Sequence, residues 1–213
     1  MTQSGTIYDI SVVLGKESMD FPGDEPFSLT WTERMQDGGA CDLSALRMSA
    51  HAGAHLDSPA HFLPGGKTLD QYPLGEFIRP AQLIEIRDPQ CVRVGELEGL
   101  EIPEGDALLF KTENSRSGRN RGGVFLERFV YLSAEAAALC VRRKVGLVGL
   151  DACSIERYGD RRFPAHRRLM EGGALILEGI HLGHVPAGRY TLVCLPLKLS
   201  GCEASPVRAV LLG

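Results

Sequence analysis

The sequence predicts a mixed α/β domain built on a largely antiparallel or mixed sheet. Candidate strands outnumber candidate helices, and the helices fall mainly in the second half of the chain. The 213 residues are 44% hydrophobic and 23% charged, which is ordinary for a soluble globular protein. No internal repeat or linker interrupts the chain. We therefore expect one domain over residues 1–213, large enough to bury a core without disulfides.

The charge balance and the cysteines exclude several classes of protein. A formal net charge of −4 gives no electrostatic basis for binding nucleic acid or an anionic membrane. No apolar run approaches the ~20 residues of a membrane helix, and no signal-peptide pattern is present, so we expect a cytoplasmic protein. The six cysteines form no C-x-x-C pair, and several lie in apolar runs. We expect them to be buried free thiols.

The first half of the chain alternates strand-like runs with turns. A Pro-Gly pair forces a turn in residues 19–24, and the polar, glycine-rich residues 35–40 read as a loop. Thr68 is placed to cap a short helical turn towards Tyr72. Residues 94–97 are helical at most briefly. The strands expected here are residues 7–14, 27–31, 42–50, 81–86 and 107–111.

The second half holds the clearest helix, over residues 133–144. Ser133 is its expected N-cap, Glu135 lies in the first turn, and basic residues 142–144 complement the C-terminal dipole. A second, shorter helix is expected to begin at Pro164 and to end at a pair of glycines. The strands expected in this half are residues 146–150, 175–180, 190–197 and 207–212.

A histidine-rich segment, residues 51–62, organises the functional prediction. His51, His55, Asp57 and His61 all occupy odd positions, so an extended chain places their side chains on one face. A helix is disfavoured because a glycine and a proline lie inside the segment. We therefore expect a strand that runs into a turn.

These residue types in this register indicate a metal site. Neutral imidazole and carboxylate are ligands of zinc, manganese and iron. Two histidines and one carboxylate leave coordination positions open, as a catalytic metal needs. The alternative is a polar strand edge with satisfied histidines, which is the usual interpretation of a single histidine but not of this cluster. A saturated structural zinc site is disfavoured because the cysteines fall outside the segment.

A carboxylate inside an apolar strand points to a partner elsewhere in the chain. Glu178 lies in the run Leu175–Ile180 and shares parity with Ile176 and Ile180. An unpaired buried carboxylate is costly, so Glu178 either turns outward or has a cationic partner. The parity favours the second interpretation.

The histidine segment resembles the H-x-G-T-H-x-D-x-P-x-H signature of the cyclase family of metal-dependent hydrolases, which includes bacterial kynurenine formamidase and isatin hydrolase. The chain departs from it at Ala54, where the family usually has threonine. The matching positions are His51, Gly53, His55, Asp57, Pro59 and His61.

The likeness continues into the second half of the chain. Pro164-Ala165-His166 and Leu177-Glu178-Gly179 are similar to the family segments that carry a histidine and a glutamate. In all, the likeness runs from Tyr8 to Leu211.

The resemblance implies a fold and an activity. The fold would be a swivelling β/β/α domain with a barrel-like mixed sheet and few helices. The activity would be metal-dependent hydrolysis of an amide-type C–N bond by metal-activated water, in a formamide or anilide such as N-formylkynurenine, a step of tryptophan catabolism. The assembly would be a homodimer or homotetramer. A lactam hydrolase of the isatin type and a non-catalytic, metal-dependent ligand-binding protein are the alternatives.

The resemblance also assigns metal ligands. His51, His55 and Asp57 would bind one divalent ion, and Asp57, His166 and Glu178 a second, with Asp57 bridging the two. We expect one or two ions per subunit, Zn²⁺ ahead of Mn²⁺.

Two further residues receive roles. His61 lies outside this ligand set and is predicted to act as the general acid/base, because the unperturbed pKa of histidine, ~6.5, lies near working pH. Phe21 stands where kynurenine formamidases commonly have a tryptophan that helps to hold the aromatic substrate. It is predicted to contact the substrate, with a turn aromatic packed on the core as an equal alternative.

The remaining polar features have weaker interpretations. Residues 112–123 carry three arginines and no apolar residue, which favours a solvated surface loop over a substrate-covering loop whose arginine meets a carboxylate. His181 and His184 match no ligand position in the family and are expected to be surface or turn residues.

Overall fold

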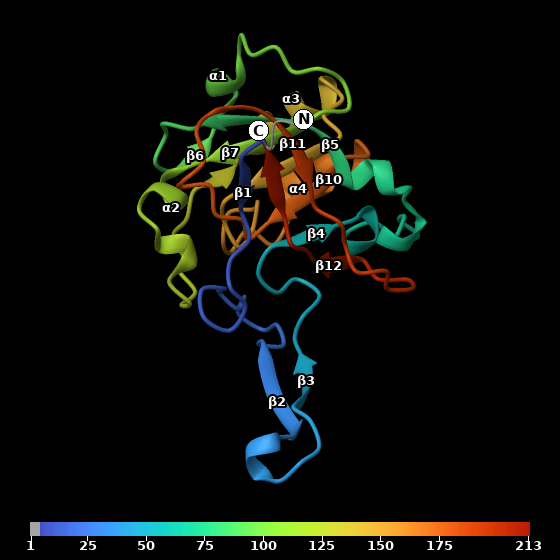
Figure 1. The fold of residues 1–213 in the computed structure, drawn as a ribbon. Coiled ribbons are helices and arrows are strands. Elements are labelled where there is room, and N and C mark those ends of the chain that lie inside the picture. Colours follow the sequence, from blue (N-terminus) through green and yellow to red (C-terminus); the bar gives the residue numbers. More distant parts are fainter. Residues whose placement is uncertain (1–4) are drawn as a thin grey trace.

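A curled nine-stranded sheet forms the centre of the computed structural model, which describes residues 5–213 (Figure 1). The spatial order of its strands is β1-β13-β11-β5-β7-β9-β10-β4-β12. The four central strands β5, β7, β9 and β10 run parallel, and the remaining pairs are antiparallel. The bounds are β1 Ile7–Asp9, β4 His55–Asp57, β5 Ile78–Glu85, β7 Ala107–Lys111, β9 Leu147–Leu150, β10 Leu175–Glu178, β11 Gly188–Val193, β12 Ala204–Pro206 and β13 Val210–Leu212.

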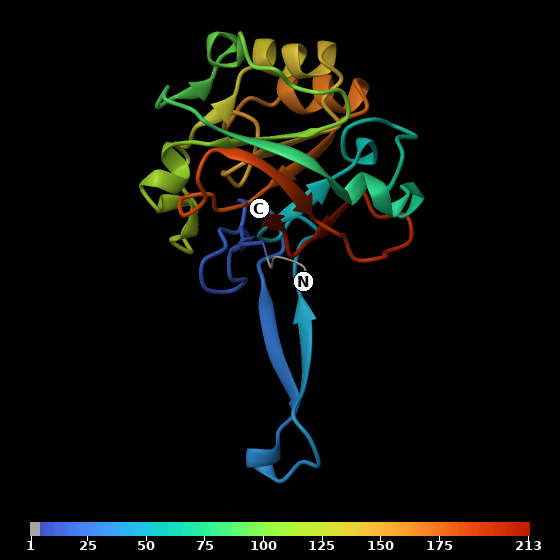
Figure 2. The same ribbon diagram turned by 45° about the horizontal axis from the view of Figure 1, so that its top comes forward.

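Few helices accompany the sheet. The two longest, α3 (Ala134–Arg142) and α4 (Pro164–Glu171), lie side by side over one face of it (Figure 2). The Ser133 hydroxyl accepts a hydrogen bond from the Ala136 N–H, and Pro164 occupies the first turn of α4, as the sequence predicts. The short helices are α1 Val94–Leu97, α2 Glu113–Arg116, η1 Met35–Asp37, η2 Pro59–His61, η3 Leu69–Gln71, η4 Leu74–Phe77 and η5 Arg119–Arg121. The expected mixed α/β class with a barrel-like sheet is confirmed.

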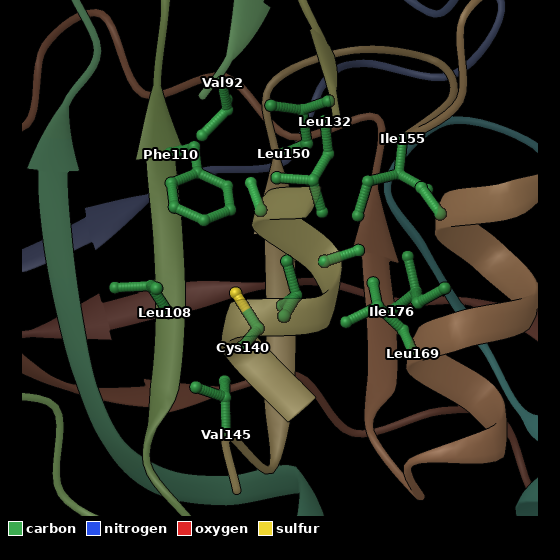
Figure 3. Packing of buried hydrophobic residues seen from close by; sticks show 14 of the residues in the cluster. Val92, Leu108, Phe110, Leu132, Cys140, Val145, Leu150, Ile155, Leu169 and Ile176 are labelled. Carbon is green, nitrogen blue, oxygen red and sulfur yellow. The ribbon is translucent and has the colours of Figure 1, made fainter. Parts of the chain in front are cut away.

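The core occupies both faces of the parallel strands. Leu108 and Phe110 of β7 pack towards α3 and α4, whereas Ala107 and Leu109 pack into the cluster on the opposite face. Figure 3 shows the helix side of this core, where Cys140 of α3 lies among residues of the strands. A strand buried on both faces reads as a continuous apolar run, which is why β9 and β10 were recognisable from sequence.

Several strand boundaries differ from the prediction. The expected strand 7–14 ends at Asp9, after which Ser11 makes only an isolated bridge to Ile180. β11 ends at Val193 rather than at residue 197. Three short strands were not predicted: β6 (Cys91–Val92), β8 (Tyr131–Leu132) and β12. Each has two or three residues, too few to display a hydrophobic period.

A hairpin projects from the body of the molecule (Figures 1 and 2). Its strands β2 (Ser28–Glu33) and β3 (Leu43–Arg47) pair only with each other, and we call residues 28–47 the arm. Leu29 and Trp31 share a face, and Leu46 lies opposite Leu29 across the pair. These three side chains are 45–58% exposed, so the arm carries a largely exposed apolar face, with the Arg34 guanidinium 5.0 Å from the Trp31 ring centroid.

The cysteines are all free, as expected. Cys91, Cys140 and Cys194 are buried and Cys153 and Cys202 are half-buried, but the expectation of burial is wrong for Cys41, which is exposed in the arm. Within residues 5–213, none of the helices has the length and apolar character that crossing a membrane requires.

Candidate active site

Strand pairing brings the two halves of the predicted site together. β4 lies beside β10 in antiparallel register, with His55 opposite Glu178 and Asp57 opposite Ile176. His55 and Asp57 share one face of β4, while Leu56 between them points into the core. Glu178 is 3% exposed, so its carboxylate is buried, as its parity within the strand predicted.

Five donor side chains lie close together around this strand pair. His55 Nε2 is 3.4 Å from Glu178 Oε2 and 3.5 Å from Asp57 Oδ1. His166, from the first turns of α4, places Nε2 3.1 Å from Glu178 Oε1 and 3.9 Å from Asp57 Oδ2. His51 Nδ1 is 2.9 Å from Asp57 Oδ1. The structure thus brings together all five of the expected donors.

The expected single strand face is wrong for the two outer histidines. The strand spans only residues 55–57, since the preceding residues form turns and η2 begins at Pro59. His51 therefore reaches Asp57 from a turn, and His61 approaches from η2. The ring centroid of His61 lies 4.3 Å from that of His51 and 6.3 Å from that of His166.

The buried polar atoms of this cluster fit a divalent metal ion. Both carboxylate oxygens of Asp57 and Nε2 of His55 are buried, and beyond the contacts with one another and with His51, His166 and Glu178 given above they have no hydrogen-bond partner in the described chain. A buried carboxylate in this state needs a cation. His55 Nδ1 lies 2.9 Å from the Gly53 carbonyl oxygen, so a proton on Nδ1 leaves the Nε2 lone pair facing the carboxylates.

The donor atoms form two overlapping groups, each compact enough to hold one ion. One comprises His55, Asp57 and Glu178, and the other His51, Asp57 and His61. Within each group the donor atoms lie within 4.8 Å of one another. The geometry therefore also brings His61, the predicted acid/base, within reach of a ligand position.

The carboxylates make the imidazoles of the cluster strongly basic. Burial opposes protonation, but the Asp57 and Glu178 carboxylates raise the pKa of His51 to about 9 and that of His166 to about 10. His61 behaves in the opposite way, because burial and the neighbouring histidines hold its pKa below the usual 6.5. The first two are thus protonated at neutral pH in the absence of a cation, and His61 is neutral.

Metal binding at neutral pH is expected to release protons, because neighbouring carboxylates raise the pKa of His51, His55 and His166 and these imidazoles must be neutral in order to coordinate. Affinity should accordingly fall as the pH falls and the protons compete better. Titration calorimetry with zinc in buffers of different ionisation enthalpy measures the number released. A binding enthalpy that does not depend on the buffer would contradict the expectation.

Two carboxylates that the sequence did not single out orient the histidines. Glu156, 4% exposed, accepts a hydrogen bond from the Ala165 N–H, and its Oε2 is 3.4 Å from His166 Nδ1. That contact directs Nε2 of His166 towards the cluster. Glu203 Oε1 lies 3.4 Å from Nε2 of His51. Both glutamates stand in ordinary polar contexts, and only the long-range packing reveals their partners.

An apolar chamber of about 290 Å³ opens above the cluster. His51, His55, His61, His166 and Glu178 line it on the polar side. Its apolar walls include Val12, Met19, Phe21, Phe62 and Phe163. Phe21 also packs against Phe125 and Tyr158, with ring centroids 5.3 and 6.0 Å away. Its position is therefore compatible with both interpretations, a wall of the chamber and a packed turn aromatic.

The favoured interpretation of residues 112–123 as a solvated loop is wrong. The segment folds around the buried carboxylate of Asp151, at the end of β9, which accepts hydrogen bonds from Thr112 and from the Ser115 N–H. Asn120 donates to the carbonyls of Asp151 and Ile180. A buried carboxylate requires such donors, and residues 112–123 supply them although they contain no apolar side chain.

The arginines of this segment do not enter the chamber. Arg116 contacts Glu113, Arg119 donates to Asn114, and Arg121 pairs with Glu17. Asn120 is the one residue of the segment in the chamber wall.

The two remaining histidines differ from each other. His184 is exposed, as expected. The surface prediction is wrong for His181, which is 9% exposed and places Nδ1 2.9 Å from Asn120 Oδ1. Burial lowers its pKa to about 4, so it remains neutral.

Comparison with known proteins gives consistent matches. The family described as putative cyclase matches residues 8–157. Kynurenine formamidase of Salinibacter ruber is 35% identical over 207 residues, 96% of each chain, and that of Bacillus mycoides is 32% identical over 203 residues, 95% of each. The solved structure of a potential metal-dependent hydrolase with cyclase activity superposes with a TM-score of 0.81 at 31% identity, covering 97% of this chain and 96% of that one. Isatin hydrolase A of Labrenzia aggregata shares the fold, with a TM-score of 0.84 at 22% identity over 98% and 93% of the two chains.

Proposed function

The chain belongs to the cyclase family of metal-dependent hydrolases, and from this premise we propose that it hydrolyses an aryl formamide of the N-formylkynurenine type. The observation that carries the proposal is a cluster of unsatisfied buried donors at the base of an aromatic chamber. The chamber suits a flat aryl group, and the donors suit the polar amide. The non-catalytic alternative is not favoured, since the relatives matched over nearly the full chain are enzymes.

We propose Zn²⁺ as the ion, in one or two copies per subunit. His51, His55, Asp57, His166 and Glu178 would hold it, a set of imidazoles and carboxylates typical of catalytic zinc. A bound divalent ion supplies Lewis-acid activation of water and of the amide carbonyl.

The side chains of the chamber would then position the amide and move its protons. The aryl ring packs between Phe21 and Phe163, which directs the formyl group towards the donors. His61, neutral at working pH, accepts a proton from the attacking water and returns it to the amide nitrogen as the C–N bond breaks. Formic acid and an arylamine leave, the acid releases its proton to solvent to give formate, and His61 is neutral again. The apolar walls limit the access of bulk water.

The decisive experiment combines metal analysis with two substrates. Purified protein should contain zinc, hydrolyse N-formylkynurenine, lose activity with a chelator and regain it with added Zn²⁺. Isatin should be a poorer substrate. Turnover unaffected by removal of the metal would contradict the proposal, and a preference for isatin would assign lactam opening instead.

We also propose that the chain assembles into a homodimer or homotetramer through the arm. A two-stranded hairpin alone is marginally stable in water, and the side chains of Leu29, Trp31 and Leu46 remain 45–58% exposed although Arg34 lies over the Trp31 ring. A second copy is the favoured occupant, because most soluble oligomers are symmetric assemblies of one chain.

Replacing Trp31 and Leu46 together by serine is therefore expected to convert the oligomer into a monomer, as measured by light scattering after size exclusion. The control is Leu74→Ser, a leucine that is 69% exposed and lies outside the arm. A wild-type chain with the mass of a single copy, 23.1 kDa, would refute the proposed assembly.

A further inference from the structure

Part of the chamber lining comes from a segment that contains no helix or strand, residues 16–24, which we call the wall segment. It contributes the side chains of Met19 and Phe21 to the apolar walls. Its backbone hydrogen bonds are mostly local, such as those from the N–H groups of residues 16–18 to the Val13 carbonyl. Its position must therefore be fixed by contacts with more distant parts of the chain.

In the described part of the chain, polar contacts attach the wall segment to distant residues at two points. At one end, the Ser49 hydroxyl donates a hydrogen bond of 3.1 Å to the Asp24 carboxylate. At the other end, the Glu17 carboxylate pairs with Arg121, and the Glu17 carbonyl accepts a hydrogen bond of 3.2 Å from the Gly123 N–H. The second attachment joins residues more than a hundred positions apart in sequence.

Gly123 allows the two segments to come this close. Its φ of +71° is a left-handed conformation that L side chains rarely adopt. A Cβ atom at this position would lie 2.6 Å from the carbonyl oxygen of Lys16, closer than side chains approach other atoms in proteins. The neighbouring Gly122 has a φ of −86°, and a Cβ atom there would make an ordinary contact of 3.6 Å. Of the two glycines, Gly123 is thus the one that the contact with the wall segment requires.

We call residues 119–125, which hold the wall segment at Glu17, the brace segment. Its Asn120 donates hydrogen bonds of 3.2 and 2.9 Å to the carbonyls of Asp151 and Ile180. These two carbonyls lie just beyond the ends of β9 and β10, and β10 carries Glu178 of the donor cluster. The brace segment therefore connects the wall segment to the strands that position the donors.

Alternate residues of the brace segment contact the wall segment. Besides Arg121 and Gly123, Phe125 packs edge-to-face against Phe21, with the ring centroids 5.3 Å apart. The side chain of Arg121 is 45% exposed and does not line the chamber. Arg121 and Gly123 therefore act on the chamber through the wall segment and do not contact a bound ligand.

We propose that Arg121 and Gly123 are positioning residues that hold Met19 and Phe21 where they pack against the aryl ring of the substrate. This inference rests on the proposed aryl formamidase function and identifies residues that set its KM. A wall that is ordered before binding costs the substrate no ordering entropy. Loss of the attachment at Glu17 should therefore weaken binding, while the donor cluster and the rate of the bound substrate change little.

Gly123→Ala tests the close approach of the two segments. On 2-formamidoacetophenone, an aryl formamide without a charged group, it should raise KM by roughly 3- to 30-fold, with kcat within about twofold and the zinc content unchanged. Gly122→Ala is the matched control and should leave KM and kcat unchanged. A rise in KM in both variants, or in neither, would overturn the positioning role.

Arg121→Gln tests the ion pair without straining the backbone. Its KM should rise by roughly 2- to 5-fold, as expected for a partly exposed ion pair, and Arg121→Lys, which keeps the charge, should lie closer to the wild type. Arg116→Gln is the control, because Arg116 pairs with Glu113 within its own helix and does not contact the wall segment. Equal KM values for Arg121→Gln and the control would contradict the role of the ion pair.

A binding measurement separates the positioning role from the proposed function. The deformylated compound, 2-aminoacetophenone, is titrated against the zinc-loaded wild type and both glycine variants, without any turnover. Weaker binding to Gly123→Ala alone supports the positioning role even if the formamide is not hydrolysed, an outcome that refutes only the formamidase activity. Equal affinity of Gly123→Ala and wild type, or no binding to the wild type, refutes the positioning role.

Discussion

Replacing Asp57 by alanine should remove the bound metal and lower kcat/KM by at least roughly 10³-fold, since metal activation of water is lost with the ion. Asp57 is the shared member of both donor groups and is fully buried, and its carboxylate oxygens lie close to ring nitrogens of His51, His55 and His166. Its removal disrupts both groups at once, whereas Glu178→Ala disrupts only one. Metal content by mass spectrometry and kcat/KM on N-formylkynurenine are the measurements.

The same variant should lose metal-dependent stability. A ligand at 1,000 times its Kd stabilises a fold by about 4 kcal/mol, which corresponds to roughly 8–16 °C in Tm for a chain of this size. Zinc should therefore raise the Tm of wild type and leave that of Asp57→Ala unchanged. Asp37→Ala, in the exposed arm, is the control and should behave as wild type. Full metal occupancy in Asp57→Ala would remove the aspartate from the ligand set.

Replacing His61 by alanine should lower kcat by roughly 10²–10⁴-fold while the metal stays bound, as for the loss of a general acid/base. Its ring centroid lies 4.3 Å from that of His51 and 6.3 Å from that of His166, and burial lowers its pKa so that it is neutral at working pH. Wild-type kcat/KM should rise with pH through a value below 6.5, because the neutral imidazole is the active form. The variant should lack that limb of the profile.

Metal content is the decisive measurement for His61, because its donor atom also lies close to those of His51 and Asp57. Loss of metal in His61→Ala would make it a ligand, and an unchanged rate would exclude it from proton transfer. His184 is an exposed histidine outside the site, so His184→Ala should leave both the metal content and the rate unchanged.

Much of the site was predictable because its signals are local. The odd-position histidines lie before, in and after a short strand, and the parity of Glu178 within Leu175–Ile180 favoured a buried carboxylate. The strands β9 and β10 could be predicted from their short apolar runs, because strands covered on both faces are continuously apolar. His166 came from the family resemblance alone, since nothing local distinguishes it from a solvated helix residue.

The missed features depend on contacts between distant residues. The polar composition of the segment 112–123 predicted a solvated loop. In the structure, Thr112 and Ser115 of this segment instead donate hydrogen bonds to the buried carboxylate of Asp151, nearly forty positions later. The roles of Glu156 and Glu203 become visible only in the folded chain, where Glu156 contacts His166 of α4 and Glu203, just before β12, contacts His51. The composition of a segment shows which hydrogen-bond donors it contains. Whether those donors are exposed or buried depends on acceptors elsewhere in the chain.

The placement of β4 between β10 and β12 also determines the order of folding and metal binding. Joining Asp57 to the strand of Glu178 closes a loop of roughly 120 residues, an entropic penalty of about 4 kcal/mol that only a nearly complete sheet offsets. A nascent chain whose residue 178 is still within the ribosome therefore carries His51, His55 and Asp57 without their partners. The ion is consequently acquired after the sheet has formed, so it should slow unfolding and leave the folding rate nearly unchanged.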